Sequence, residues 1–339
     1  IIALVVTLVV TGLVVLVAAA RWRDRLPPIA RRAVRPGAHV ALAVVPATFL
    51  AGQVGGLVGS TGAYLAFVAV VAALLGAATW TVDRRRPGLG AIAAVGVIVG
   101  LFVLDVVLGA PLQVNTVFGY SLAVAGRFAG FGNLAFALFG ASTILLGVLL
   151  VDRYGDRAMP WTAALFVGVV LLEGLPMLGA DVGGVLSMVP AFGVTLLILG
   201  GNRPTARDVA LLVVAAFGAV TLFAFVDTLR PGGEQSHLAR LAEHLVHGRV
   251  GSLSDSLSRR VQASFGAMDT AVWAFVVAAV LLVGLYVALV ARAERGARPL
   301  VGPTSPVVAA AAVGIGLLAA IGLVANDSSI AVPTTMLIP

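Results

Sequence analysis

The stretch FGNLAFALFGASTILLGVLLV, residues 131–151, decides the fold class. It carries no charged side chain and ends against Asp152 and Arg153. A helix of about 20 apolar residues is long enough to cross the hydrocarbon core of a bilayer. Comparable stretches recur along the chain and give ten candidate spans: 1–20, 38–54, 59–82, 89–109, 131–151, 161–178, 183–200, 208–226, 270–292 and 306–324. The sequence therefore predicts an all-α, polytopic integral membrane bundle of about ten transmembrane helices.

The composition excludes a water-soluble globular domain. Hydrophobic residues make up 60% of the chain and charged residues 11%, and the mean hydropathy is +1.08. All 22 basic residues are arginine, a usage typical of GC-rich genomes such as those of actinobacteria. The net charge of +7 does not indicate nucleic-acid binding, because most arginines flank the predicted spans. The absence of cysteine excludes disulfides and thiol chemistry.

Arginine is distributed unevenly between the two sets of connectors. One set holds 16 of the 22: Arg21, Arg23, Arg25, Arg31, Arg32, Arg35, Arg84, Arg85, Arg86, Arg153, Arg157, Arg203, Arg207, Arg292, Arg295 and Arg298. The positive-inside rule predicts that this set is cytoplasmic. Both ends of the segment and the loops 55–58, 110–130, 179–182 and 227–269 are then extracytoplasmic, in the plasma membrane of a cell.

The chain is predicted to form a single membrane domain, residues 1–339, with an extracytoplasmic amphipathic loop at 227–269. Ile1 already lies inside an apolar run, and no charged region precedes it. We therefore expect the chain to be a fragment of a longer protein and not to begin with a signal peptide.

Ionisable residues within the spans gather near the predicted outer ends. A charge at the centre of a membrane helix costs roughly 2.5–3.5 kcal/mol on insertion scales, so each one requires a reason. Glu173 and Asp181 flank a junction interrupted by glycine and proline, and are the candidate general bases. The supporting polar cluster consists of Asp105, Asp227, Asn326 and Asp327. The alternative reading is that these side chains cap helices or meet headgroup water.

The segment GRFAGFGN, residues 126–133, leads directly into a span and is a candidate anion site. Its glycines let backbone amides approach a ligand, and Arg127 adds a guanidinium. Backbone amides from Gly130 to Asn133 complete this candidate site. The alternative is a boundary arginine paired with Glu173 or Asp181. A Walker A loop is absent.

The loop 227–269 contains a predicted amphipathic helix at 236–248. Its apolar face holds Leu238, Leu241, Leu245 and Val246, and its polar face holds His237, Arg240, His244 and His247. Arg230, His237 and Arg240 are candidate contacts for a phosphate or lipid headgroup. A solvated polar face is the alternative. No metal is expected, because a zinc site needs further ligands and no HExxH motif occurs.

Four strings carry a family resemblance: GRFAGFGNLAFALFG (126–140), GADVGGVLSMVPAFG (179–193), DTLRPGGEQSHLARL (227–241) and ANDSSIAVP (325–333). They resemble the C-terminal multipass membrane region of a family from actinobacteria and Firmicutes. Full-length members carry an extracytoplasmic domain similar to alkaline phosphatases or phosphoglyceromutases. The resemblance implies that such a domain belongs to the same full-length chain. It implies no activity for the membrane region itself.

Three functions fit these features. The leading hypothesis is a membrane module of a cell-envelope protein with an outward-facing polar pocket for an anionic, phosphate-bearing lipid or glycan intermediate. The second is a secondary transporter or flippase, favoured by Gly/Pro-interrupted spans. The third is a non-catalytic scaffold that anchors an extracytoplasmic domain. Membrane lipids are the expected partners, nucleic acid and cofactors are not expected, and whether the chain is an enzyme stays open.

Overall fold

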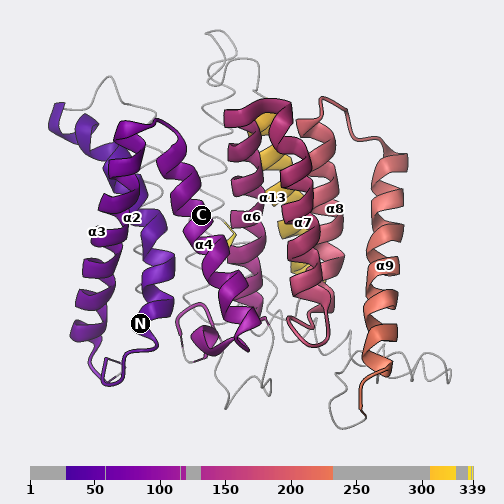
Figure 1. Cartoon of the computed structure of the whole chain (residues 1–339), viewed down its shortest axis with the longest axis horizontal. Helices are drawn as coiled ribbons and strands as arrows, with labels where there is room; N and C mark the ends of the chain where they lie inside the picture. The colour runs from indigo at the N-terminus through magenta and orange to yellow at the C-terminus, as the bar shows by residue number, and fades with distance from the viewer. Residues whose placement is uncertain are drawn as a thin grey trace.

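The computed structural model describes residues 28–57, 59–114, 116–119, 131–231, 306–325, 335, 336 and 338. These residues form α2 (Pro28–Ala51), α3 (Thr61–Arg85), α4 (Leu89–Val107), η2 (Pro111–Gln113), α6 (Asn133–Tyr154), η3 (Gly155–Ala158), α7 (Met159–Gly174), α8 (Val182–Leu199), α9 (Ala206–Thr228) and α13 (Pro306–Ala325). The predicted all-α class is confirmed for this part of the chain, because every long element in it is a helix (Figure 1).

Seven segments of the described chain are long and apolar enough to cross a membrane. One of them, Asn133–Gly174, contains both α6 and α7, which η3 joins into a helical pair. Eight predicted spans overlap helices of the structure. The spans 1–20 and 270–292 lie outside the described residues. The chain is therefore a multipass helical membrane protein.

Two helix boundaries differ from the predicted spans. Helix α2 begins at Pro28, ten residues before the predicted span at 38, because the helix continues past the apolar stretch through Arg32 and Arg35. Helix α7 ends at Gly174 instead of 178. Leu175, which precedes Pro176, has an extended backbone with ψ 130°, as the proline ring requires of the residue before it.

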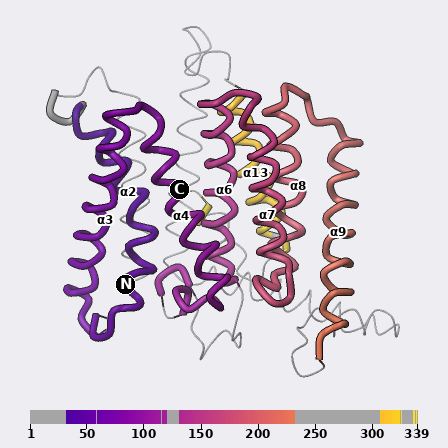
Figure 2. Tube along the Cα trace, in the orientation of Figure 1, coloured from indigo at the N-terminus to yellow at the C-terminus, as the bar shows by residue number. Residues whose placement is uncertain are grey.

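The helices pack largely in chain order, as the trace in Figure 2 follows. Helix α6 is central: residues 135–144 are all buried, and α4, α7, α8 and α13 contact it. Helix α9 lies at the periphery, where it packs on α8 and touches α7 (Figure 1). Only 17% of an 18-residue apolar stretch of this helix is buried. An apolar helix with so little burial is suited to a lipid environment.

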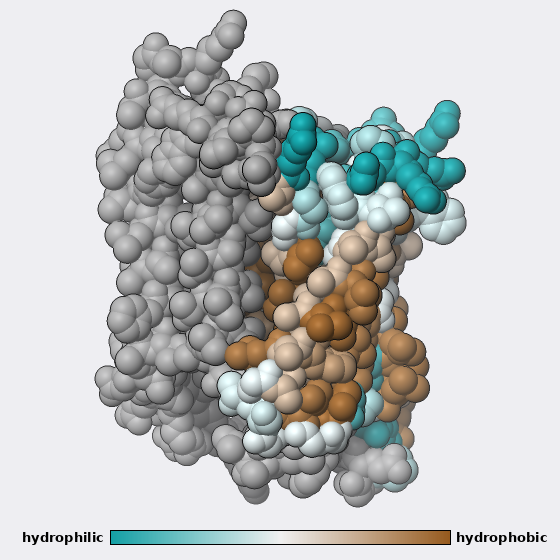
Figure 3. All heavy atoms as spheres, turned by 90° about the vertical axis from the view of Figure 1, so that its left-hand side faces the viewer, coloured by the Kyte–Doolittle hydropathy of each residue, from teal (hydrophilic) through white to brown (hydrophobic). Residues whose placement is uncertain are grey.

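The surface has the polarity expected of a membrane protein. Figure 3 shows a band of apolar side chains below a strongly polar end of the bundle. Large exposed apolar side chains include Leu74, Val70 and Val214, at 67%, 58% and 68% exposure. In water these side chains would be a liability, whereas in a bilayer they contact lipid tails.

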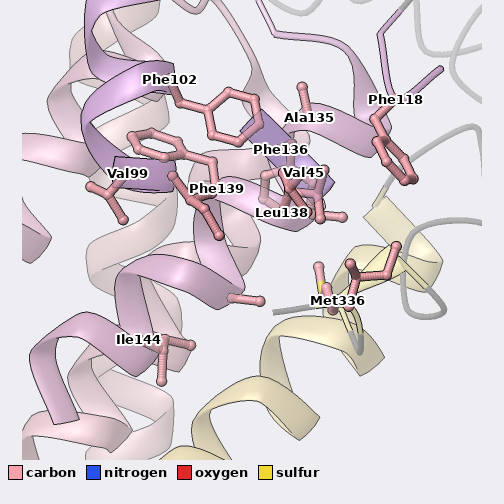
Figure 4. Packing of buried hydrophobic residues seen from close by; sticks show 14 of the residues in the cluster. Val45, Val99, Phe102, Phe118, Ala135, Phe136, Leu138, Phe139, Ile144 and Met336 are labelled. Carbon is pink, nitrogen blue, oxygen red and sulfur yellow. The ribbon is translucent and has the colours of Figure 1, made fainter. Parts of the chain in front are cut away.

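A cluster of aromatic rings fills the core between α2, α4 and α6. Phe49, Phe102, Phe118, Phe131 and Phe139 are each 1% exposed or less, and several of them appear in Figure 4. The Phe102 ring centroid lies 5.1 Å from that of Phe49 and 5.7 Å from that of Phe139. Since lipid tails are as apolar as these rings, close van der Waals packing holds the helices together here.

Candidate functional site

The two ends of the bundle carry opposite chemistry. The arginine end holds the connections α3–α4, α6–α7 and α8–α9, with Arg84, Arg85, Arg86, Arg153, Arg157, Arg203 and Arg207 (Figure 1). The carboxylate end is where α4, α7 and α9 finish and α6 and α8 begin. Asp105, Glu173, Asp181 and Asp227 all lie there. Chain direction along each helix therefore separates these seven arginines from the four buried carboxyl groups.

Asp105 organises the connection that follows α4. Its Oδ1 accepts a hydrogen bond of 2.6 Å from the Leu112 amide, and its Oδ2 accepts one of 2.8 Å from Gln113 Nε2. Asp105 and Gln113 are both fully buried. Buried polar groups are tolerated when they are hydrogen-bonded in this way. Asp105 is therefore a structural group that fixes η2 against the end of α4.

Gln113 extends this link to the beginning of α6. Its Oε1 accepts the Gly132 amide at 2.9 Å, so its amide group joins Asp105 to the segment before α6. The neighbouring Phe131 amide donates to the Gly179 carbonyl at 3.2 Å. Two of the four amides predicted for anion binding are therefore already engaged within the protein. The part of the candidate anion site built on the Phe131 and Gly132 amides is wrong for that reason.

Glu173 lies one residue before the end of α7 and is fully buried. It packs against Gly184 of α8, where a Cβ would lie 2.5 Å from Glu173 Oε1. Glycine at 184 is thus required for this side chain to occupy its place between the two helices. The Glu173 carbonyl accepts the Asp181 amide at 2.9 Å. The two candidate bases therefore flank one compact turn, Glu173 at the end of α7 and Asp181 at the start of α8.

Asp181 is the N-cap of α8. Its Oδ1 accepts the Gly183 amide at 3.0 Å, and the residue is 3% exposed. A carboxylate in this position satisfies a free amide of the first helical turn and complements the helix dipole. The capping interpretation that the sequence left open therefore holds for Asp181. Glu173 lies against the same first turn of α8 through its contact with Gly184.

Backbone strain also concentrates at the carboxylate end. Among the described residues, two that are not glycine have positive φ: Ala110 at 62° and Ala180 at 50°. Ala110 precedes η2, and Ala180 precedes Asp181. Left-handed backbone at a residue with a Cβ costs of order 1–3 kcal/mol, and such residues cluster at functional sites.

Arg230 joins the end of α9 to the turn between α7 and α8. Its Nη1 donates to the Pro176 carbonyl at 3.2 Å and lies 3.5 Å from Asp227 Oδ1. Asp227 is fully buried, whereas the Arg230 side chain is 23% exposed. Arg230 thus brings a positive charge to the rim of the carboxylate end. A guanidinium held by a carboxylate in this way can still bind an anion.

The remaining predicted site residues divide into two groups. Asn133 is the first residue of α6 and is half-buried. The others lie outside the described residues: Arg127, His237, Arg240, Asn326 and Asp327. Their part in the site stays a prediction. Within the described ranges, no group of three His, Asp or Glu side chains could hold a metal ion.

Sequence reasoning missed Gln113 and Gln53. Gln113 connects three elements, and Gln53 Nε2 donates to the Pro111 carbonyl at 3.1 Å, which links the end of α2 to η2. A signal was present for Gln113: an amide side chain within the otherwise apolar APLQV, residues 110–114, needs partners inside the protein. Nothing in the sequence identifies those partners.

The chain matches no protein-family model, no curated protein and no solved structure.

Proposed function

We propose that the chain is a membrane module of a cell-envelope protein that binds an anionic, phosphate-bearing lipid or glycan intermediate at its carboxylate end. The observation that carries this proposal is Arg230, a partly exposed cation beside the turn that connects Glu173 to Asp181. A guanidinium is well suited to phosphate, because two N–H groups match two phosphate oxygens.

The surroundings of Arg230 favour a ligand that approaches from lipid or from the membrane surface. Leu229 and Met177 beside it are 71% and 56% exposed. Phosphorylated lipids combine an apolar chain with an anionic headgroup, so they fit a cation bordered by exposed apolar side chains. Arg127, His237 and Arg240 complete the proposed anion site from the segments before α6 and after α9.

The core beside the carboxylate end favours binding over passage through the bundle. Phe102 lies one helical turn before Asp105, and Phe131 lies next to Gly132. Their ring centroids are 6.3 Å apart, and both rings are fully buried. Closely packed rings here leave no space for a ligand to pass between α4 and the segment before α6, which supports binding from the carboxylate end.

In this proposal the carboxylate end faces outward across the plasma membrane, the chain makes ten crossings, and both ends of the segment are extracytoplasmic. The arginine asymmetry supports this orientation. An extracytoplasmic phosphatase-like domain in the same full-length chain would then lie on the same side as the bound phosphate. Glu173 is the residue we propose as general base in any reaction of this ligand.

The test compares two arginines with similar local contacts. Arg230 Nη1 donates to the Pro176 carbonyl at the carboxylate end, and Arg153 Nη1 donates to the Pro87 carbonyl, at 2.7 Å, at the arginine end. Arg230→Gln and Arg153→Gln each keep a side-chain donor and remove the charge. The probe is dioctanoyl phosphatidic acid, with dioctanoyl phosphatidylcholine as the neutral control, and calorimetry in detergent measures the affinity.

We expect Arg230→Gln to weaken phosphatidic acid binding about tenfold, the loss of one charge-assisted hydrogen bond pair. Arg153→Gln should bind as the unmodified protein does. Equal affinity in both variants and the unmodified protein would refute the proposal. So would equal binding of the neutral lipid.

A second candidate function is proton-coupled transport, and one observation favours it. Glu173 is a fully buried carboxyl group at the junction where α7 gives way to α8. Intramembrane carboxyl groups at such junctions serve as proton carriers in transporters. Proton flux into proteoliposomes, measured with an internal pH dye, would be lost in Glu173→Gln if this function holds. Flux unchanged by Glu173→Gln would exclude it.

A further inference from the structure

A second buried polar cluster lies at the opposite end of the molecule, between α2 and α3. His39 of α2 is 6% exposed. Its Nδ1 lies 3.1 Å from Thr79 Oγ1, and its Nε2 lies 3.9 Å from Asp83 Oδ2. Thr79 and Asp83 are one turn apart on α3. The imidazole is thus held between a hydroxyl group and a carboxylate.

Close helix packing buries the imidazole, while the carboxylate of the cluster stays partly exposed. Val40, the residue after His39, lies against Gly76 of α3, where a Cβ would be 2.6 Å from the Val40 Cα. The Asp83 side chain is 12% exposed. Asp83 also accepts the Gly88 amide at 2.8 Å, so the same carboxylate fixes the connection between α3 and α4.

The Thr79 hydroxyl can serve either protonation state of the imidazole. It lies 3.1 Å from both the Leu75 and the Gly76 carbonyl oxygens. When His39 is neutral with its proton on Nε2, the Thr79 hydroxyl donates to Nδ1. When a proton binds Nδ1, the hydroxyl rotates to donate to a helix carbonyl, and Nδ1–H donates to Oγ1. In both states Nε2–H faces Asp83.

We propose that His39, Thr79 and Asp83 form a proton-binding site at the arginine end. One proton from the aqueous phase binds Nδ1 of neutral His39, and the charge of the His39–Asp83 pair changes from −1 to 0. Rotation of one hydroxyl group is the only rearrangement required. The bound proton turns the contact of a neutral imidazole with a carboxylate into an ion pair and strengthens the attachment of α2 to the α3–α4 connection.

The other charged groups near this site are few. Helix α3 contributes Asp83 to it, while Arg84, Arg85 and Arg86 at its end are exposed. On α2, Arg35 lies one turn before His39 and is exposed. Helix α4 has one ionisable residue, Asp105, at the carboxylate end, and η2 has none. Asp83 is therefore the dominant electrostatic partner of His39 among the described residues.

The attachment matters because α2 is a weakened helix. Pro36 and Pro46 lie within it, on either side of His39. Each proline removes a backbone hydrogen bond and favours a kink. A proton-dependent contact placed between two prolines can therefore change the bend of α2 at a small cost in free energy.

Trp80 provides a direct probe of the site, because its ring centroid lies 5.7 Å from that of His39. A protonated imidazole quenches indole fluorescence at contact distance, and a neutral one does so far less. The chain contains three other tryptophans, Trp22, Trp161 and Trp273. Replacing these three with Phe in the full chain leaves Trp80 as the only indole, and its emission is recorded in nanodiscs from pH 8 to pH 5.

We expect the Trp80 emission to fall through one protonation step in this range. His39→Gln in the same background should abolish the step, and Asp83→Asn should move it to lower pH by about one pH unit, because the neighbouring negative charge is lost. Thr79→Val should also move it to lower pH, since Nδ1–H then has no acceptor. The last two variants keep the test decisive if His39→Gln does not fold.

Two results would overturn the proposal. One is emission that does not change with pH in the protein that retains His39. The other is a step that persists in His39→Gln or is unmoved by both Asp83→Asn and Thr79→Val, because the titrating group would then be another residue.

Discussion

The two ends of the bundle use the same interaction in different surroundings. At the arginine end, Asp208 accepts the Thr205 amide at 2.9 Å and completes a capping box at the start of α9, where the pair is exposed. At the carboxylate end, Asp105 accepts the Leu112 amide at 2.6 Å and is fully buried. Each carboxylate satisfies a backbone donor, but only one of them does so out of contact with water.

This difference predicts which end of the protein is rigid. When an exposed carboxylate is removed, water takes its place as the hydrogen-bond acceptor, so the protein loses little stability. When a buried carboxylate is removed, its hydrogen-bond donors have no other acceptor, and the protein bears the full cost of their desolvation. The carboxylate end is thus a connected frame, from Asp105 through Gln113 and the segment 131–132 to Gly179 in the turn between α7 and α8. At the arginine end, the capping box of α9 is a local contact between Thr205 and Asp208 that is exposed to solvent.

The largest expected effect comes from Asp105→Ala. It leaves the Leu112 amide and the Gln113 side chain unpaired inside the protein, and we expect the free energy of unfolding to fall by about 2–4 kcal/mol. Unfolding in mixed micelles of increasing SDS content measures this. The matched control Asp208→Ala removes a carboxylate that also accepts a backbone amide, and should cost a small fraction of that loss.

Asp105→Asn sharpens the comparison. An asparagine can accept one of the two hydrogen bonds, but its own amide then opposes the other donor. It should therefore remain clearly less stable than the unmodified protein. Stability equal to the unmodified protein in Asp105→Asn would show that the two accepted hydrogen bonds do not support the carboxylate end.

A smaller effect is expected for Gly184→Ala. The new methyl group meets Glu173 and forces that side chain or α8 to move, at a cost of about 1–3 kcal/mol. Gly168→Ala, on the same helix as Glu173, is the control, because no heavy atom lies within 4 Å of a Cβ there. The same unfolding assay should find Gly168→Ala neutral or slightly stabilising. Equal behaviour of the two variants would contradict the close packing of Glu173 against α8.

The smallest effect is a gain. Ala180→Gly relieves the left-handed backbone at φ 50° in the turn before Asp181. Part of this gain is offset by the greater freedom of glycine in the unfolded chain, so we expect a net stabilisation of about 0.5 kcal/mol. The reverse comparison uses Gly155, at φ 63° at the arginine end. Gly155→Ala should destabilise the protein by about 1–3 kcal/mol, because φ 63° with ψ −152° is a backbone conformation that essentially only glycine adopts. A destabilised Ala180→Gly would contradict the strain at Ala180.

Much of the fold could be predicted from the sequence, because hydropathy alone marks a membrane helix. Uncharged stretches such as 131–151 correspond to helices, and their alternating direction puts Asp105, Glu173, Asp181 and Asp227 at one end. Boundaries were less accurate. Hydropathy reports where lipid ends and not where the helix ends, so the arginine-bearing start of α2 was missed.

The details of the site could not be predicted, because they depend on contacts between distant segments. Gln113 meets Gly132 across 19 positions, and Arg230 meets Pro176 across 54. His39 was also missed, since a histidine within a long apolar stretch shows no periodic signal, and its partners lie on the next helix. A single sequence identifies which polar groups are costly in a membrane, but not what each of them binds.

The sidedness of the two ends is tested most directly by cysteine labelling, for which the cysteine-free chain is well suited. Met177→Cys reports on the carboxylate end and Asn202→Cys on the arginine end, and both positions are exposed. With a membrane-impermeant maleimide, we predict that Met177→Cys reacts in intact cells and that Asn202→Cys reacts only after lysis. Labelling of Asn202→Cys in intact cells, with Met177→Cys protected until lysis, would contradict an outward-facing carboxylate end.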